Sequence, residues 1–181
     1  ACRQNKAWQD AGCDPVPVAV NISSRQFMAG GFSVMVREIL EETGLDPRYL
    51  ELEFTERLIS DVQRAKAAVA ELRDIGVTVS IDDFGSGFSS LRLLSELPIN
   101  KLKIDQAFIR ELDDRNKALT RAAVMLARNL GLDVLAEGVE TDAQLAFLRQ
   151  LGCAWVQGNR CFAPMEPEQI EALLRRRGTD A

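Results

Sequence analysis

Short apolar runs alternate with longer amphipathic segments along the whole chain. Each run is rich in aliphatic and β-branched residues, a pattern typical of strands buried in a parallel sheet. The runs predict six strands, at Val16–Asn21, Leu50–Phe54, Val77–Ile81, Lys101–Ile104, Asp133–Ala136 and Ala154–Gln157.

The segments between these runs carry apolar residues three and four positions apart, the spacing of one helical face. They predict helices at Ser33–Glu42, Asp61–Asp74, Arg115–Leu130, Thr141–Leu151 and Glu166–Arg176, with a further helical segment from Leu91 to Leu97. Thr141 and Gln144 have the spacing of a capping box, and a glycine follows four of the predicted helices. Because no polar linker interrupts the alternation, residues 1–181 are predicted to form a single α/β domain with a parallel sheet or barrel.

Composition narrows the possible functions. The chain has 181 residues, 46% of them hydrophobic, which is enough for one core. A net charge of −5 argues against binding a DNA or RNA polymer, but it allows a small phosphate ligand held through metal. The four cysteines lack the spacing of a zinc site, which indicates free thiols in a reducing compartment. No apolar run has membrane-spanning length and no signal peptide is visible, so a cytoplasmic location is expected.

The N-terminal residues predict a chain that lacks part of its domain. Residues 1–8 read as the interior of a helix, with no initiator Met and no capping residue. A (β/α)₈ barrel usually needs about 250 residues, with about 200 as the lower limit. We therefore expect a TIM-like (β/α)₈ barrel that is incomplete at the N-terminus and lacks its first one or two β-α units.

A polar residue with a chemical use stands at the carboxyl end of each predicted strand. These residues are Asn21, Glu53, Asp82 with Asp83, Lys103 with Asp105, Glu137 and Gln157. A single strand-end acid is usually solvated surface, and Lys103 with Asp105 could simply be an ion pair at the sheet edge. If the strands close into a barrel, however, all of these side chains meet at one mouth.

The types of these residues favour a site for hard divalent cations. The chain has no histidine, which excludes Ser-His-Asp catalysis and His-ligated zinc or iron. Carboxylate and amide oxygens are ligands that Mg²⁺ and Mn²⁺ prefer. Asp82 could bridge two metals about 3.5–4 Å apart, the geometry of phosphoryl transfer, and Lys103 could orient a water or stabilise charge on a phosphate. Gly85 and Gly87 permit a sharp turn after the acid pair but do not form a dinucleotide-binding fingerprint.

Six motifs in order resemble one known family. They are Asn21-Ile22-Ser23, Glu53-Phe54-Thr55-Glu56, Asp82-Asp83-Phe84-Gly85-Ser86-Gly87, Lys103-Ile104-Asp105, Ala136-Glu137-Gly138-Val139-Glu140 and Gln157-Gly158. In order and spacing they resemble the signature set of EAL domains, which are bacterial cyclic-di-GMP phosphodiesterases. The resemblance covers nearly the whole chain.

The resemblance implies an activity and a role for each motif. The family hydrolyses one phosphodiester of cyclic-di-GMP to linear pGpG with Mg²⁺ or Mn²⁺, in a barrel whose first strand is antiparallel to the others. Asn21, Glu53 and Asp82 would bind one metal, and Asp82, Asp83 and Glu137 the second. The catalytic residues would be Lys103, near the attacking water, with Glu53, Glu137 and Gln157. Glu56 would anchor the loop after Asp83, while Asp105 and Glu140 would support the site or contact substrate.

The family also implies partners beyond the substrate. A homodimer is expected, as is a fused sensory, receiver or diguanylate cyclase domain in the parent protein, which could be membrane-tethered.

Two departures from the family pattern affect the expected site. The strand with the Glu-Ala-Leu segment, whose Glu is a metal ligand, is not in this chain; residues 171–173 spell the same letters within the last predicted helix. Asn159 stands where the family usually has an aromatic residue, which affects contacts to substrate. Because every metal ligand visible in the chain is intact, we expect the parent protein to be active. Because the first strand and its ligand are missing, we expect the 181-residue piece alone to be inactive. The alternatives are a receptor that binds cyclic-di-GMP without cleaving it and, in another enzyme class, an enolase-like barrel with a lysine base.

Overall fold

A parallel sheet of six strands forms the centre of the computed structural model, which describes residues 1–28, 30–55, 62–85 and 91–177. The strands lie in sequence order, so each one pairs with the next along the chain. They are β1 (Val18–Asn21), β2 (Leu50–Thr55), β3 (Thr78–Phe84), β4 (Lys101–Ile104), β5 (Asp133–Ala136) and β6 (Trp155–Val156).

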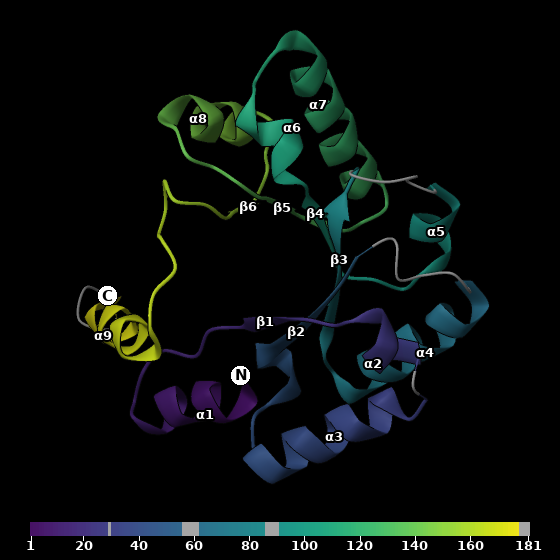
Figure 1. Ribbon diagram of the computed structural model, residues 1–181, viewed down its shortest axis with the longest axis vertical. Coiled ribbons are helices and arrows are strands. Elements are labelled where there is room, and N and C mark those ends of the chain that lie inside the picture. The colour runs from purple at the N-terminus through teal and green to yellow at the C-terminus, as the bar shows by residue number, and fades with distance from the viewer. Residues whose placement is uncertain (29, 56–61, 86–90, 178–181) are drawn as a thin grey trace.

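Helices connect the strands and cover one face of the sheet (Figure 1). They are α1 (Cys2–Asp10), α2 (Ser24–Met28), α3 (Phe32–Thr43), α4 (Val62–Ile75), α5 (Leu91–Glu96), α6 (Gln106–Arg110), α7 (Asp114–Asn129), α8 (Asp142–Gln150) and α9 (Pro167–Arg177), with a 3₁₀ turn η1 (Pro47–Tyr49) before β2. The sheet curls into part of a TIM-like barrel with β1 and β6 at its two edges, which confirms the predicted fold class.

Most predicted elements are present within two residues of their expected ends. The main difference is β3, which continues to Phe84 instead of ending at Ile81. Asp82 and Asp83 therefore belong to the strand itself, where the pairing of β3 with β4 shifts register between Ile81 and Phe84. The glycine-rich loop predicted after them falls on residues 86–90, outside the described part of the chain.

The two faces of the sheet have opposite chemistry. In β2, Leu50, Leu52 and Phe54 belong to the main hydrophobic core, while Glu51 and Glu53 alternate with them and point to the inner face. The same alternation places Leu102 in the core and Lys103 on the inner face of β4. The hydrophobic core thus lies between the sheet and its helices, and the concave inner face is polar.

Capping interactions fix where the long helices begin. The Asp113 carboxylate accepts a hydrogen bond from the backbone N–H of Asn116 at the start of α7. Thr141 and Gln144 form the predicted capping box at the start of α8, and the Gln144 side-chain amide also donates to the carbonyl of Ile109. This last bond attaches α8 to the segment that follows β4.

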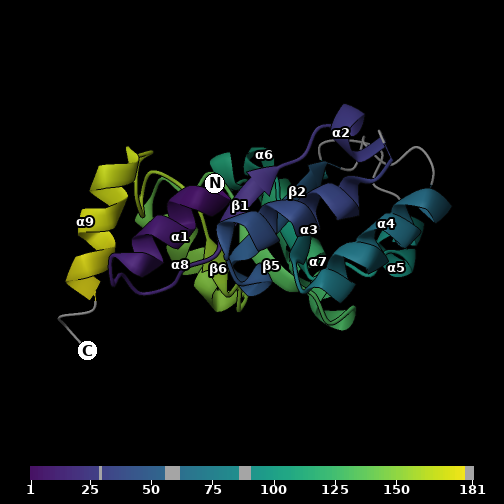
Figure 2. The ribbon, with the colours of Figure 1, turned by 90° about the horizontal axis from the view of Figure 1, so that it is seen from below.

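A second, smaller apolar cluster joins the two ends of the described chain. Trp8 and Cys13, in and just after α1, are buried together with Leu174 of α9. Figures 1 and 2 both place α9 beside α1, at some distance from the sheet. The segment between β6 and α9 runs along one side of the molecule in Figure 1 and brings α9 to its packing partner α1.

Across the residues that the structure describes, no helix is both long and apolar enough to cross a bilayer.

Replacing a core residue should test the packing of β4. Leu102 is 0% exposed, so Leu102→Ala should lower the free energy of unfolding by about 2–5 kcal/mol through lost transfer energy and a residual cavity. Urea denaturation followed by circular dichroism measures this change. The control is Met125→Ala on α7, where the side chain is 58% exposed and the expected loss is below about 0.5 kcal/mol. Equal losses in the two variants would contradict the assigned core.

Candidate functional site

Lys103 lies at the centre of a buried group of carboxylates. Its Nζ is 2.8 Å from Glu53, 3.0 Å from Asp82 and 2.8 Å from Glu137. The residue is only 2% exposed, so these carboxylates are its partners in place of solvent. An ammonium group has three N–H donors, and each one has a carboxylate within hydrogen-bond distance here.

Four neighbouring strands bring this group together. Glu53 comes from β2, Asp82 from β3 and Lys103 from β4, while Glu137 directly follows β5. Because the strands are parallel and hydrogen-bonded in sequence order, residues near their carboxyl ends meet at one edge of the sheet. The backbone N–H of Glu137 donates to the carbonyl of Ile104, which continues the β4–β5 pairing up to the site.

A tight turn follows Glu137. Gly138 has φ +68°, a left-handed conformation that side chains disfavour. A Cβ atom at this position would lie 2.5 Å from the Cβ of Gln106. Glycine is therefore required at this turn, both for its backbone conformation and for the close approach of α6.

Asp82, Asp83 and Glu137 form the part of the group that could hold a metal ion. One carboxylate oxygen from each lies within 4.8 Å of the others, which is compatible with ligation of a shared cation. Asp83 has φ +54°, the one left-handed non-glycine backbone in the described residues. Its N–H donates to the side chain of Asp82 at 3.0 Å, which orients that carboxylate.

Among the residues that the structure describes, the charges at this site do not balance. One ammonium faces three carboxylates, a formal charge of −2, and Asp83 adds another negative group beside Asp82 and Glu137. Burial raises the pKa of both Glu53 and Glu137, Lys103 opposes the rise, and repulsion from Asp82 adds to it. Burial alone would lower the pKa of Lys103, but its bonds to Glu137 and Glu53 outweigh burial and raise it, so the lysine stays protonated. Excess negative charge in a sheltered site favours a bound cation.

The other predicted site residues lie around this centre. Asn21 is exposed at the end of β1 and pairs in register with Glu53. Gln157 and Glu140 are exposed at the same edge; Gln157 follows β6 directly, and the backbone N–H of Glu140 donates to Gln144. Asp105 caps α6 by accepting from the N–H of Ala107 at 2.7 Å, and among the described ion pairs Lys103 has other partners. Glu56 lies outside the described residues.

A second charged layer on the inner face was not predicted from the sequence. Lys101 forms an ion pair with the buried Glu51 and lies 5.7 Å from the ring centre of Trp155. Both charged residues stand two positions before a site residue on the same strand, so they point to the same face. This two-residue spacing of Glu51 with Glu53 and of Lys101 with Lys103 was the signal available in the sequence.

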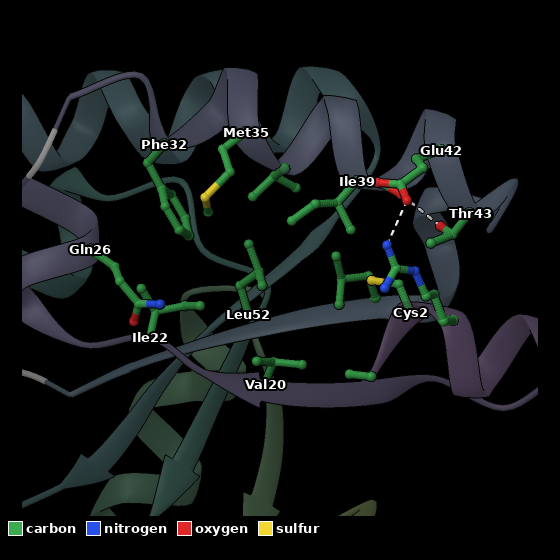
Figure 3. Close-up of a pocket in the computed structure, with 14 residues that line it drawn as sticks. Cys2, Val20, Ile22, Gln26, Phe32, Met35, Ile39, Glu42, Thr43 and Leu52 are labelled. Atoms are coloured by element: carbon green, nitrogen blue, oxygen red, sulfur yellow. Dashed lines mark hydrogen bonds and ion pairs between the residues drawn. The ribbon is translucent and has the colours of Figure 1, made fainter.

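A cavity lies on the other face of the sheet. It has a volume of about 410 Å³ between α3 and the outer face of β1 and β2 (Figure 3). Val20, Ile22, Leu52, Met35 and Ile39 line it, and the Arg3–Glu42 ion pair closes one end. Because its lining is mostly aliphatic, this cavity is less suited to a phosphate or a metal ion than the group of carboxylates at the strand ends.

Comparison with known proteins identifies the family of this chain. Residues 1–164 match the family described as "EAL domain". The chain belongs to the EAL domain family. This EAL domain is 44% identical over 177 residues to the bifunctional diguanylate cyclase/cyclic di-GMP phosphodiesterase MucR of Pseudomonas aeruginosa, with 96% of this chain and 26% of MucR aligned.

Solved EAL structures share the fold. The MucR phosphodiesterase in complex with c-di-GMP has a TM-score of 0.89 at 44% identity, covering 94% of this chain and 70% of that one. The EAL domain of Mycobacterium smegmatis DcpA has a TM-score of 0.93 at 34% identity, covering 97% and 81%. A more distant structure, Klebsiella pneumoniae BlrP1 as a manganese/cy-diGMP complex, has a TM-score of 0.77 at 27% identity, covering 87% and 40%. The chain spans between 21% and 26% of the length of the first four curated relatives that it matches.

Replacing Glu137 should change how stability depends on pH when metal is removed. Because folding raises the pKa of this carboxyl above its ordinary value of 4.5, the folded state binds the proton more tightly than the unfolded state. Its contribution therefore makes stability fall as pH rises from 4.5 through the raised pKa. Glu137→Gln removes this fall, so the Tm of the variant minus that of wild type should be more positive at about pH 8 than at about pH 5.

Thermal melts in EDTA measure this difference. The control is Glu140→Gln, since Glu140 is exposed and makes its hydrogen bond to Gln144 through the backbone. That variant should keep the wild-type pH profile. The expected sign would be contradicted if the Tm of Glu137→Gln minus that of wild type were the same at every pH, or more positive at about pH 5 than at about pH 8.

Proposed function

We propose that this EAL domain, within the protein that carries it, hydrolyses cyclic-di-GMP, cleaving one of its two phosphodiester bonds to give linear pGpG. The observation that carries the proposal is the cluster of Glu53, Asp82, Asp83 and Glu137 around Lys103 at the carboxyl ends of the strands. The identity to a relative named as a cyclic di-GMP phosphodiesterase supports the choice of substrate. In the reaction a water oxygen adds to phosphorus, the bond from phosphorus to one 3′ oxygen breaks, and that oxygen leaves as a hydroxyl.

The donor set fits hard divalent cations, and Mg²⁺ or Mn²⁺ is the proposed cofactor. We assign Asn21, Glu53 and Asp82 to one ion and Asp82, Asp83 and Glu137 to a second. The close approach of the last three carboxylates and the excess negative charge support this assignment. Such ions supply positive charge that stabilises the phosphodiester as it gains negative charge.

The other assignments concern what the chain's own side chains do. Lys103 is the proposed catalytic cation, which orients the attacking water through an N–H and attracts the developing negative charge. Glu53 and Glu137 position Lys103 through their bonds to it. Gln157 is assigned to the water or the substrate on the exposed side, Asp105 and Glu140 to support or substrate contact, and Glu56 to the loop after Asp83.

The wider setting of the domain is also proposed. A homodimer, a fused sensory, receiver or diguanylate cyclase domain and a cytoplasmic position are expected. The limited share of the curated relatives that the chain spans is consistent with such fusion.

Turnover of cyclic-di-GMP is the direct test. A protein that carries this chain in full is incubated with cyclic-di-GMP and Mn²⁺, and the products are separated by chromatography. The proposal expects pGpG to form with Mn²⁺ and not with EDTA. If the protein binds cyclic-di-GMP but forms no pGpG, the proposed hydrolysis is wrong and the domain is a receptor for cyclic-di-GMP.

Two glutamates on one strand allow a matched test of the assigned residues. Glu53→Gln should lower kcat about 100-fold or more, because it removes a proposed ligand and a partner of Lys103. Glu51→Gln is the control, since Glu51 is equally buried two residues earlier but pairs with Lys101. It should cost stability and leave kcat within about threefold of wild type, since Glu51 pairs with neither Lys103 nor a proposed metal ligand. Equal activity of the Glu53→Gln variant and wild type would rule out the proposed site.

A further inference from the structure

Lys103 shares its carboxylates with the group that could hold a metal ion. Asp82 and Glu137 are both within 3.0 Å of Lys103 Nζ and both belong to the trio with Asp83. These carboxylates therefore serve two cations, one built into the chain and one taken from solution. Since oxygens drawn toward one cation are less available to the other, the two positive charges compete for them.

The lysine is placed to hold the site together without metal. Glu53, Asp82 and Glu137 come from three different strands or strand ends, and like charges at this distance repel one another when sheltered from water. The ammonium lies between all three and leaves no N–H without a carboxylate. It therefore neutralises part of the charge that would otherwise push the ends of β2, β3 and β5 apart.

We infer that Lys103 is an internal counter-ion, which keeps the strand-end carboxylates assembled when metal is absent. Metal binding must then loosen the contacts between Lys103 and these carboxylates. The inference rests on the metal site of the proposed function. Its consequence is an order of events: the Lys103 N–H groups become available to water or substrate only after a divalent cation has taken over the carboxylates. Lys103, the proposed catalytic cation, would then be available to the substrate only when the metal is in place.

Lys101 provides a matched control on the same strand and the same face. It is also paired with a buried glutamate, but it contacts Glu51 and the ring of Trp155 and not the trio of carboxylates. Loss of Lys101 thus removes a buried ion pair without releasing any proposed metal ligand.

Metal binding measured by calorimetry separates the two roles and does not depend on turnover. Wild type, Lys103→Met and Lys101→Met, each in a protein that carries this chain in full and freed of metal with a chelator, are titrated with Mn²⁺. We expect Lys103→Met to bind Mn²⁺ roughly tenfold more tightly than wild type, a typical size for coupling between two sites. Lys101→Met should bind Mn²⁺ within about twofold of wild type, because its site is uncoupled from the trio.

Melting temperature gives the second readout. Without metal, Lys103→Met should melt about 10 °C below wild type, because it leaves buried carboxylates without their cation. Saturating Mn²⁺ should recover most of this loss, and should not recover the loss in Lys101→Met. If Lys103→Met is unfolded after chelation, refolding on addition of Mn²⁺ supports the inference, and failure to refold overturns it.

The outcomes distinguish this inference from the function on which it rests. If wild type binds Mn²⁺ and Lys103→Met binds it equally or more weakly, the lysine does not compete with metal, and the inference fails while the metal site stands. If neither protein binds Mn²⁺, both the inference and the proposed metal site fail. Lys103→Arg, which keeps the charge, should resemble wild type in metal-free Tm more closely than Lys103→Met does.

Discussion

The attraction between Lys103 and three carboxylates is the interaction on which the arrangement of the strand ends depends. Groups of like charge that are sheltered from water repel strongly, and three strands bring such groups to one point. Replacement of a buried charge group by apolar residues is often neutral or stabilising, so the cluster is not explained by stability alone. The cluster fits the proposed metal site, which would accept positive charge from solution and yet would have to exist before that charge arrives.

Strand alternation is what makes this polar site compatible with a stable fold. Leu50, Leu52 and Phe54 of β2 pack beneath the helices, and the residues between them face inward. The apolar area therefore accumulates on the outer face, where α3, α4 and α7 cover it. The inner face is free to carry charge because it contributes little to the hydrophobic core.

Much of this fold is visible in the sequence because its signals are local. The exact bounds of β4 and β5, the capping box at Thr141 and the polar residues at the strand ends all follow from a few neighbouring positions. The short helices α2 and α6 were not predicted, since five residues are too few to show a helical period. The continuation of β3 through Asp82 and Asp83 was not predicted either, because acidic residues are poor strand formers. The strand continues because Asp82 pairs with Thr55 of β2 and Phe84 pairs with Ile104 of β4.

The site was predicted as a set of residues, and its internal geometry was not. That Lys103 bonds to Glu53, Asp82 and Glu137 depends on the register of four strands, which no local pattern specifies. The sequence did not indicate that Asp105 caps a helix, because its position close to Lys103 suggested an ion pair between the two residues. The left-handed backbone of Asp83 has no signal in the residue itself, because most aspartates have negative φ.

The contact between α1 and α9 sets the order in which this chain can complete its structure. Trp8 is buried against Leu174, so its cover is made from residues that the ribosome adds more than 160 positions later. Each β-α step can form as soon as it emerges, since every strand pairs with the one before it. The indole of Trp8 must wait until α9 has been made, and until α9 docks it is an apolar surface that a chaperone could bind.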